Sequence, residues 1–101
     1  MADRFLFLLD AKARFRLAYD AQQWIIQRRV GSPRPGEGPA MRDTGWKAVS
    51  FIGGELRVLQ RCLREAGVRL TPVAQAHLDA LPEQFLDFIA NPNSYTIRAA
   101  A

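Results

Sequence analysis

The stretch ARFRLAYDAQQWIIQRRV, residues 13–30, decides the fold of this chain. Every second residue is apolar in each half of the stretch except at Arg28, and the segment 20–23 separates the two halves. This period of two is typical of half-buried strands, and the separator has the length of a hairpin loop. The stretch therefore predicts a β-hairpin with one apolar face. The apolar positions are Phe15, Leu17, Tyr19, Trp24, Ile26 and Val30.

The register of the hairpin follows from its aromatic residues. If Tyr19 pairs with Trp24, Leu17 pairs with Ile26 on the same face, and Arg28 faces Phe15 near the end of the sheet. A single long helix over residues 11–29 is the alternative, because Ala, Arg and Gln are good helix formers. We prefer the hairpin because the alternation is cleaner than any spacing of three or four.

The same register creates a basic row on the opposite face of the hairpin. Arg16 falls opposite Gln27 and Arg14 opposite Arg29, and Lys12 extends the row. Like charges that face each other are unfavourable in a sheet unless water, an acidic segment of the same chain or an anionic partner meets them. The row is therefore either a solvated surface or a site for an anion.

The rest of the chain places strands first and helices second. Residues 4–9 predict a first strand whose apolar run suggests burial on both faces or a central position, and residues 46–52 predict a last strand. An amphipathic helix over 55–66 follows, then a second helix that begins at Thr71-Pro72, and a last segment over 83–90. We predict a single α+β domain, 1–101, in which two or three helices pack on one face of three or four antiparallel strands.

Two segments do not predict regular structure. Residues 31–45 hold four Gly and three Pro and form either a flexible connector or a binding loop that presents Arg34 and Arg42. The tail 94–101 is expected to fray.

Arginine dominates the charge of this chain. Twelve Arg and two Lys stand against ten acidic residues, for a net charge of +4. The basic excess lies in residues 1–50, and a run of acids follows residue 78, so we expect a basic side and an acidic side. One Cys excludes an internal disulfide, and the apolar run 5–9 is too short for a signal or a membrane span. We expect a cytoplasmic protein that does not bind membranes.

No motif for catalysis, metal or cofactor binding is visible, so we expect no enzyme, no metal site and no cofactor. His77 lacks companions at a metal-like spacing, and Cys62 fits a small core residue better than a nucleophile. Asp79, Glu83 and Asp87 recur every four residues and suggest an acidic face. The basic candidates for binding are Lys12, Arg14, Arg16, Arg29, Arg34 and Arg42, together with a helical stripe of Arg57, Arg61 and Arg64.

The runs LAYDAQQWIIQRRVG and GWKAVSFIGGELRVLQRCLREAG resemble small proteins that phages and prophages encode. The residues that carry the resemblance are Asp20, Gln23, Trp24, Arg28, Arg29, Trp46 and Leu56. The resemblance implies a mobile-element origin, and small phage proteins of this size include anti-CRISPR inhibitors. The basic charge departs from the acidic, DNA-mimicking type of inhibitor.

Two functions fit these patterns. The first is a phage-type binding protein that inhibits or modulates a nucleic-acid-handling protein complex. The second is a nucleic-acid-binding module that uses its Arg-rich sheet face. A homodimer that pairs through a free sheet edge is a weaker, third option.

Overall fold

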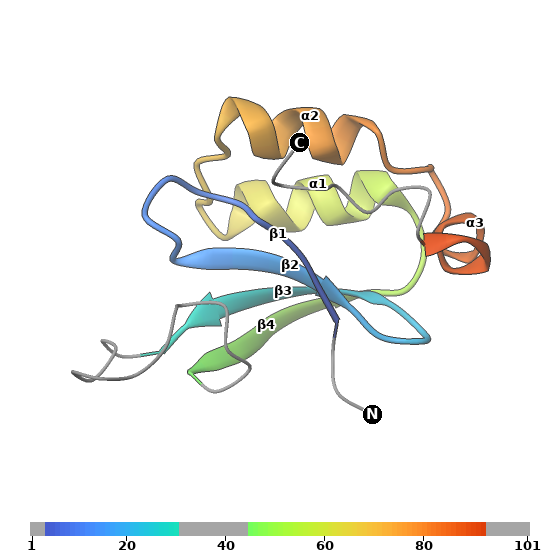
Figure 1. Ribbon diagram of the computed structural model, residues 1–101, viewed down its shortest axis with the longest axis horizontal. Coiled ribbons are helices and arrows are strands. Elements are labelled where there is room, and N and C mark those ends of the chain that lie inside the picture. Colours follow the sequence, from blue (N-terminus) through green and yellow to red (C-terminus); the bar gives the residue numbers. More distant parts are fainter. Residues whose placement is uncertain (1–3, 31–44, 93–101) are drawn as a thin grey trace.

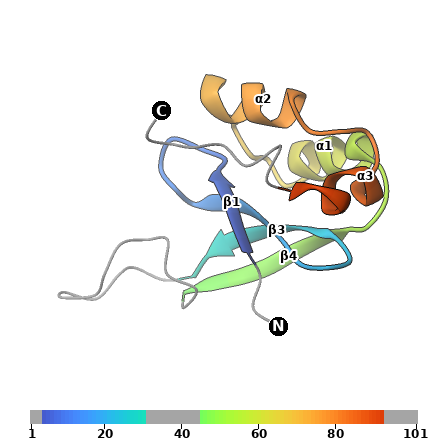
Figure 2. The same ribbon diagram turned by 45° about the vertical axis from the view of Figure 1, so that its right-hand side comes forward.

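The computed structural model describes residues 4–30 and 45–92, and it confirms the α+β arrangement. Four strands come first and three helices follow. The strands form one antiparallel sheet in the order β1-β2-β3-β4, and the helices cover one of its faces (Figures 1 and 2). The elements are β1 (Arg4–Leu8), β2 (Phe15–Tyr19), β3 (Trp24–Arg29), β4 (Trp46–Ile52), α1 (Leu56–Glu65), α2 (Pro72–Asp79) and α3 (Phe85–Ala90).

The predicted hairpin is confirmed in its register. Tyr19 pairs with Trp24, Leu17 with Ile26 and Arg16 with Gln27. The single long helix over residues 11–29 is wrong, because β2 and β3 occupy this stretch.

Asp20 fixes the turn of the hairpin. Its Oδ1 accepts hydrogen bonds from the backbone N–H of Gln22 at 2.8 Å and of Gln23 at 3.0 Å. These bonds hold the pKa of the Asp20 carboxyl below its usual value of 3.8, and the bond from Gln22 has the largest effect.

Of the two alternatives for the first strand, the central position is wrong, because β1 lies at an edge of the described sheet and pairs with β2. Its register shifts between Phe5 and Phe7, and this irregularity lets both Leu6 and Phe7 enter the core. The apolar run therefore reflects an irregular edge strand and not burial between two neighbours.

An aromatic cluster joins the sheet to the last helix. The Trp24 ring meets Phe85 edge-on with 5.2 Å between ring centroids, and Tyr19 meets Phe88 in the same way at 4.9 Å. Edge-to-face pairs of this kind add about 0.5–1.5 kcal/mol each beyond the area they bury. The Trp24 indole N–H is buried and has no acceptor among the described residues.

The helices begin and end close to the predicted positions. Thr71 caps α2, since its hydroxyl oxygen accepts from the backbone N–H of Ala74 at 3.0 Å. Pro82 separates α2 from α3, which begins at Phe85 and not at Glu83. Over residues 4–30 and 45–92, no helix is long and apolar enough to cross a membrane.

Candidate binding surfaces

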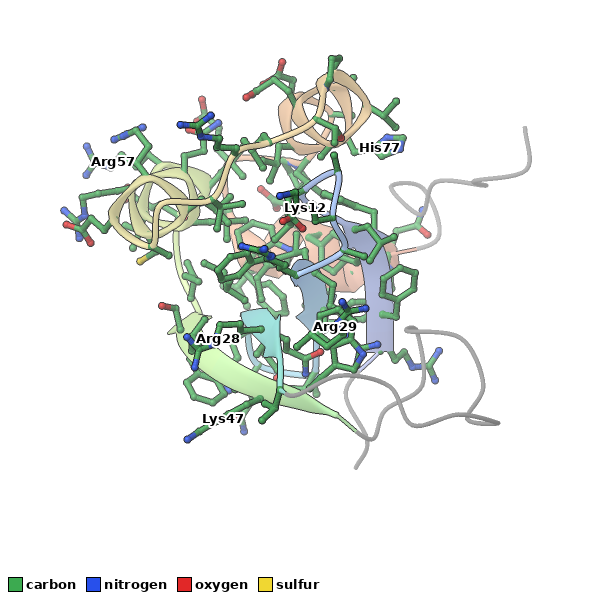
Figure 3. The ribbon with its side chains drawn as sticks, turned by 90° about the vertical axis from the view of Figure 1, so that its left-hand side faces the viewer. Lys12, Arg28, Arg29, Lys47, Arg57 and His77 are labelled. Carbon is green, nitrogen blue, oxygen red and sulfur yellow. The ribbon has the colours of Figure 1, made fainter. Side chains whose placement is uncertain are left out.

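Basic side chains from several elements gather at one end of the sheet. The β1–β2 turn, the end of β3, the start of β4 and the α1–α2 connection all lie on the left in Figure 1. Figure 3 looks onto this end and shows four of the side chains around it. Among the residues that the structure describes, the acidic residues at this end are Asp10 and Glu65. We call Lys12, Arg14, Arg28, Arg29, Lys47 and Arg69 the basic end; all are exposed except Arg29, which is partly buried.

Asp10 organises the turn that carries two of these cations. Its Oδ1 accepts from the backbone N–H of Arg14 at 2.8 Å and of Phe15 at 3.0 Å. Ala13 completes the turn in the left-handed region, with φ of 55°. The turn is therefore held in one conformation before any ligand arrives.

A hollow of about 410 Å³ lies beside this turn. Lys12 and Arg14 line one side of it, and Arg69 joins them from the α1–α2 connection. The connection is held against the turn, because Asp10 forms a β-bridge with Leu70. Three cations thus share one concave surface, which suits a phosphate or a carboxylate.

One residue of the basic row predicted from the hairpin, Arg16, is not on the surface. Arg16 is only 1% exposed, so it cannot reach a partner. Its guanidinium lies 4.4 Å from the centroid of the Trp46 ring and 5.5 Å from that of Phe5, and its Nε donates to Gln27 Oε1 at 2.5 Å. Arg16 therefore belongs to the packing of the sheet.

The sheet face away from the helices also holds aromatic residues that the sequence reasoning missed. One row of paired residues runs across all four strands as Phe5, Ala18, Ile25 and Phe51. Phe51 is 60% exposed, whereas Ala18 and Ile25 are buried. The sequence holds a signal for this position. If Ile52, at the end of the predicted strand 46–52, packs on the same face as Trp24, its neighbour Phe51 must point to the opposite face. We call this surface the outer face.

The other predicted basic residues fall into two groups. Arg57, Arg61 and Arg64 form the expected exposed stripe on α1. Arg34 and Arg42 lie outside the described residues, as do most of the predicted loop 31–45 and the tail 94–101.

The acidic residues do not form one continuous helix face. Asp79 is the last residue of α2, Glu83 lies in the connection after it, and Asp87 belongs to α3. The break at Pro82 changes the direction of the chain, so a spacing of four no longer means one face. All three side chains are exposed.

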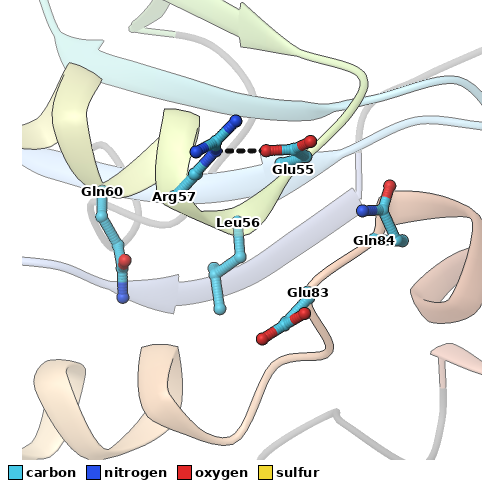
Figure 4. A pocket seen from close by; sticks show the side chains of 6 residues that line it. All are labelled: Glu55, Leu56, Arg57, Gln60, Glu83 and Gln84. Atoms are coloured by element: carbon cyan, nitrogen blue, oxygen red, sulfur yellow. Dashed lines mark hydrogen bonds and ion pairs between the residues drawn. The ribbon is translucent and has the colours of Figure 1, made fainter.

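These acids nevertheless gather at one end of the fold, opposite the basic end. The β2–β3 turn, the β4–α1 connection, the end of α2 and α3 lie on the right in Figure 1. A hollow of about 470 Å³ lies there. Figure 4 shows the side chains that line it, with Glu83 near Leu56 and Arg57 ion-paired with Glu55. We call Asp20, Glu55, Asp79, Glu83 and Asp87 the acidic end.

His77 and Cys62 remain isolated residues. The His77 ring packs on Phe7 with 5.2 Å between centroids, and burial lowers its pKa below 6.5. Cys62 is a free thiol that packs against the core. Within the described part of the chain, no group of three or more His, Cys, Asp or Glu residues could hold a metal ion.

No protein-family model matches this chain, and no curated protein or solved structure matches it either. The resemblance to phage proteins therefore stays a prediction.

Proposed function

We propose that this protein is a non-enzymatic binding protein that engages nucleic acid through its basic end. The observation that supports this proposal is the meeting of Lys12, Arg14 and Arg69 around one hollow, beside a turn that Asp10 holds in place. Arginine forks and lysine ammonium groups are the usual donors to phosphate oxygens. A turn whose backbone is already held loses less conformational entropy on binding than a free loop would.

Fluorescence anisotropy with labelled oligonucleotides at several salt concentrations tests the proposal. Arg14→Glu removes a cation of the basic end, and Arg57→Glu is the matched control because Arg57 is an exposed Arg at the acidic end. Affinity should fall several-fold for Arg14→Glu, and the slope of log affinity against log salt should become shallower by about 0.7–0.9. Equal losses for both variants would contradict a site at the basic end.

A second candidate function uses the acidic end. In this proposal the protein is a phage-type inhibitor of a nucleic-acid-handling complex, of the anti-CRISPR kind. Five exposed or partly exposed carboxylates gather at this end, where they can compete with phosphates for a basic groove of a protein partner.

Affinity capture from a host lysate tests this second candidate. The triple variant Asp79→Lys, Glu83→Lys and Asp87→Lys should lose a captured protein that the wild type retains. Arg14→Glu, at the opposite end, is the control and should retain it. If Arg14→Glu loses the captured protein and the triple variant retains it, the acidic end is not the contact.

A further inference from the structure

Helix α3 carries a leucine that the core does not use. Phe85 and Phe88 turn toward the core, which leaves Leu86 and Asp87 on the outward side of the helix. Leu86 is 76% exposed. Asp87 and the nearby Glu83 are exposed carboxylates, and neither has a hydrogen-bond or ion-pair partner among the described residues. The acidic end therefore presents an apolar side chain beside two uncompensated negative charges.

The basic end presents the complementary surface. The hollow of about 410 Å³ beside the β1–β2 turn has Phe15 in its lining together with the cations Lys12, Arg14 and Arg69. None of these cations has an ion-pair partner among the described residues. The carboxylate of Asp10 also lies in the lining, but it is engaged by two backbone N–H groups of the turn. The hollow thus combines apolar surface with three uncompensated positive charges, and an apolar centre with a charged rim is the usual build of a protein interface.

The two surfaces cannot meet within one molecule. They lie at opposite ends of the long axis in Figure 1, and strand β3 alone keeps them about 20 Å apart. Their charges are opposite in sign, so the acidic end of one copy is attracted to the basic end of another. Because each copy carries one surface of each kind, the contact is heterologous, and one copy adds to the next head to tail.

The sheet edges offer a second copy a poorer contact. β1 and β4 are the edge strands of the described sheet, and each contains a register shift, between Phe5 and Phe7 in β1 and at Val49 in β4. Bulges bend an edge strand and hinder the addition of another one, and the exposed Lys47 adds a charge to β4. A second copy is therefore expected at the ends of the fold and not at the sheet edges.

We infer that this protein associates with itself head to tail, with Leu86 of one copy seated in the hollow at the basic end of the next. Glu83 and Asp87 then lie against the cations that line the hollow. The contact covers the surface that the proposed function gives to nucleic acid, so the two compete, but self-association does not depend on nucleic-acid binding. Its charges stay partly exposed, so we expect a weak contact that forms at high protein concentration and low salt.

Sedimentation velocity at rising protein concentration tests the inference. The sedimentation coefficient of the wild type should rise with concentration at low salt and stay constant in about 1 M salt, where the Debye length is about 3 Å. Two double variants each disable one end: Leu86→Ser with Asp87→Asn, and Arg14→Gln with Arg69→Gln. Each should remain a monomer alone. Their equal mixture should form a dimer and nothing larger, because one intact end of each kind remains.

The control variant is Val49→Ser. Val49 is an exposed apolar residue, 42% accessible, that lies along β4 between the two ends, so its loss should leave the association unchanged. If Val49→Ser abolishes the association, the contact lies at the sheet edge and the inference is overturned. A circular dichroism spectrum of each variant checks that it folds.

The remaining outcomes separate this inference from the proposed function. A wild type that stays monomeric at low salt overturns the inference, and the proposed function stands if oligonucleotides still bind through the basic end. Association that only one of the two double variants abolishes, or that neither abolishes, means that the ends do not pair with each other and also overturns it. Association that both variants abolish and their mixture restores supports the inference, even if the wild type binds no oligonucleotide and the proposed function fails.

Discussion

The buried pair of Arg16 and Gln27 allows the sharpest test of the packing on the outer face. The Gln27→Leu substitution removes the acceptor at 2.5 Å from Arg16 Nε and keeps a side chain of similar length. Arg16 is 1% exposed, so water cannot replace that acceptor without a rearrangement. A hydrogen bond to a charged group contributes about 1.5–3 kcal/mol, and we expect Gln27→Leu to lower the free energy of unfolding by about 2 kcal/mol.

The reciprocal substitution is Arg16→Met, which keeps an unbranched stem between Phe5 and Trp46 but removes the charge. It loses the hydrogen bond and the contact with the Trp46 ring, and the latter contributes about 0.5–2 kcal/mol. The double variant Arg16→Met with Gln27→Leu replaces both polar groups by apolar ones. We expect it to lie within about 1 kcal/mol of the wild type, because replacing a buried polar pair as a whole is often neutral.

Urea unfolding followed by circular dichroism measures all three variants. A loss of 2 kcal/mol corresponds to a fall in melting temperature of about 8–16 °C for a domain of this size. The two single losses should exceed the loss in the double variant, with a coupling of about 0.5–3 kcal/mol. If Gln27→Leu costs less than about 0.5 kcal/mol and the effects simply add, Arg16 is not held by Gln27 and the reasoning is refuted.

Three further predictions concern the core, the second helix and His77. Trp24→Ala should lower the free energy of unfolding by about 3–5 kcal/mol, and Trp24→Phe should cost much less because it also removes the buried indole N–H that has no described acceptor; urea unfolding of both variants checks this. Thr71→Ala should cost about 1 kcal/mol by removing the cap of α2, with Thr71→Ser as a control that retains most of the stability. Burial lowers the pKa of His77, so the unfolded chain binds a proton at this residue more readily than the folded chain does. Neutral His77 therefore costs the fold nothing above pH 6.5, and the free energy of unfolding falls as the pH drops below 6.5 toward the folded-state pKa. His77→Gln should flatten that part of the pH profile, and an unchanged profile would assign the slope to other groups.

The hairpin could be predicted from the sequence because its two faces differ in polarity. Placing Tyr19 opposite Trp24 puts four large apolar side chains on one face, and a slip of one residue would turn one strand's pair to the opposite face. The core uses that face, with Phe85 and Phe88 packed against Trp24. Local alternation was sufficient here because the turn is short and Asp20 holds it.

The burial of Arg16 could not be predicted in the same way. The side chains that flank its guanidinium, Phe5 and Trp46, come from the two edge strands of the sheet. The hairpin of β2 and β3, which the sequence pattern predicts, contains neither Phe5 nor Trp46. A charged residue in an alternating strand is expected to face solvent unless its neighbours on more distant strands are known.

The gathering of charge at two ends follows from the up-and-down path of the chain. Successive elements run in opposite directions, so the connections that the structure describes lie at alternate ends of the sheet (Figure 1). The charges are mainly basic around the β1–β2 turn, the end of β3, the start of β4 and the α1–α2 connection, with Asp10 and Glu65 as exceptions. They are mainly acidic around the β2–β3, β4–α1 and α2–α3 connections, with Arg57 as an exception. The contributing residues, in chain order, are Lys12, Arg14, Asp20, Arg28, Arg29, Lys47, Glu55, Arg69, Asp79, Glu83 and Asp87.

This alternation determines how each end acts on a partner. The six residues of β3 separate the two ends by about 20 Å, and the Debye length at physiological salt is about 8 Å. The acidic end therefore does little to weaken the field of the basic end, although the net charge is only +4. Reversing the exposed Glu83 to Lys raises the net charge by two at the far end, and screening predicts almost no gain in oligonucleotide affinity at physiological salt. A large gain would mean that binding follows total charge, and the basic end would then not be a local site.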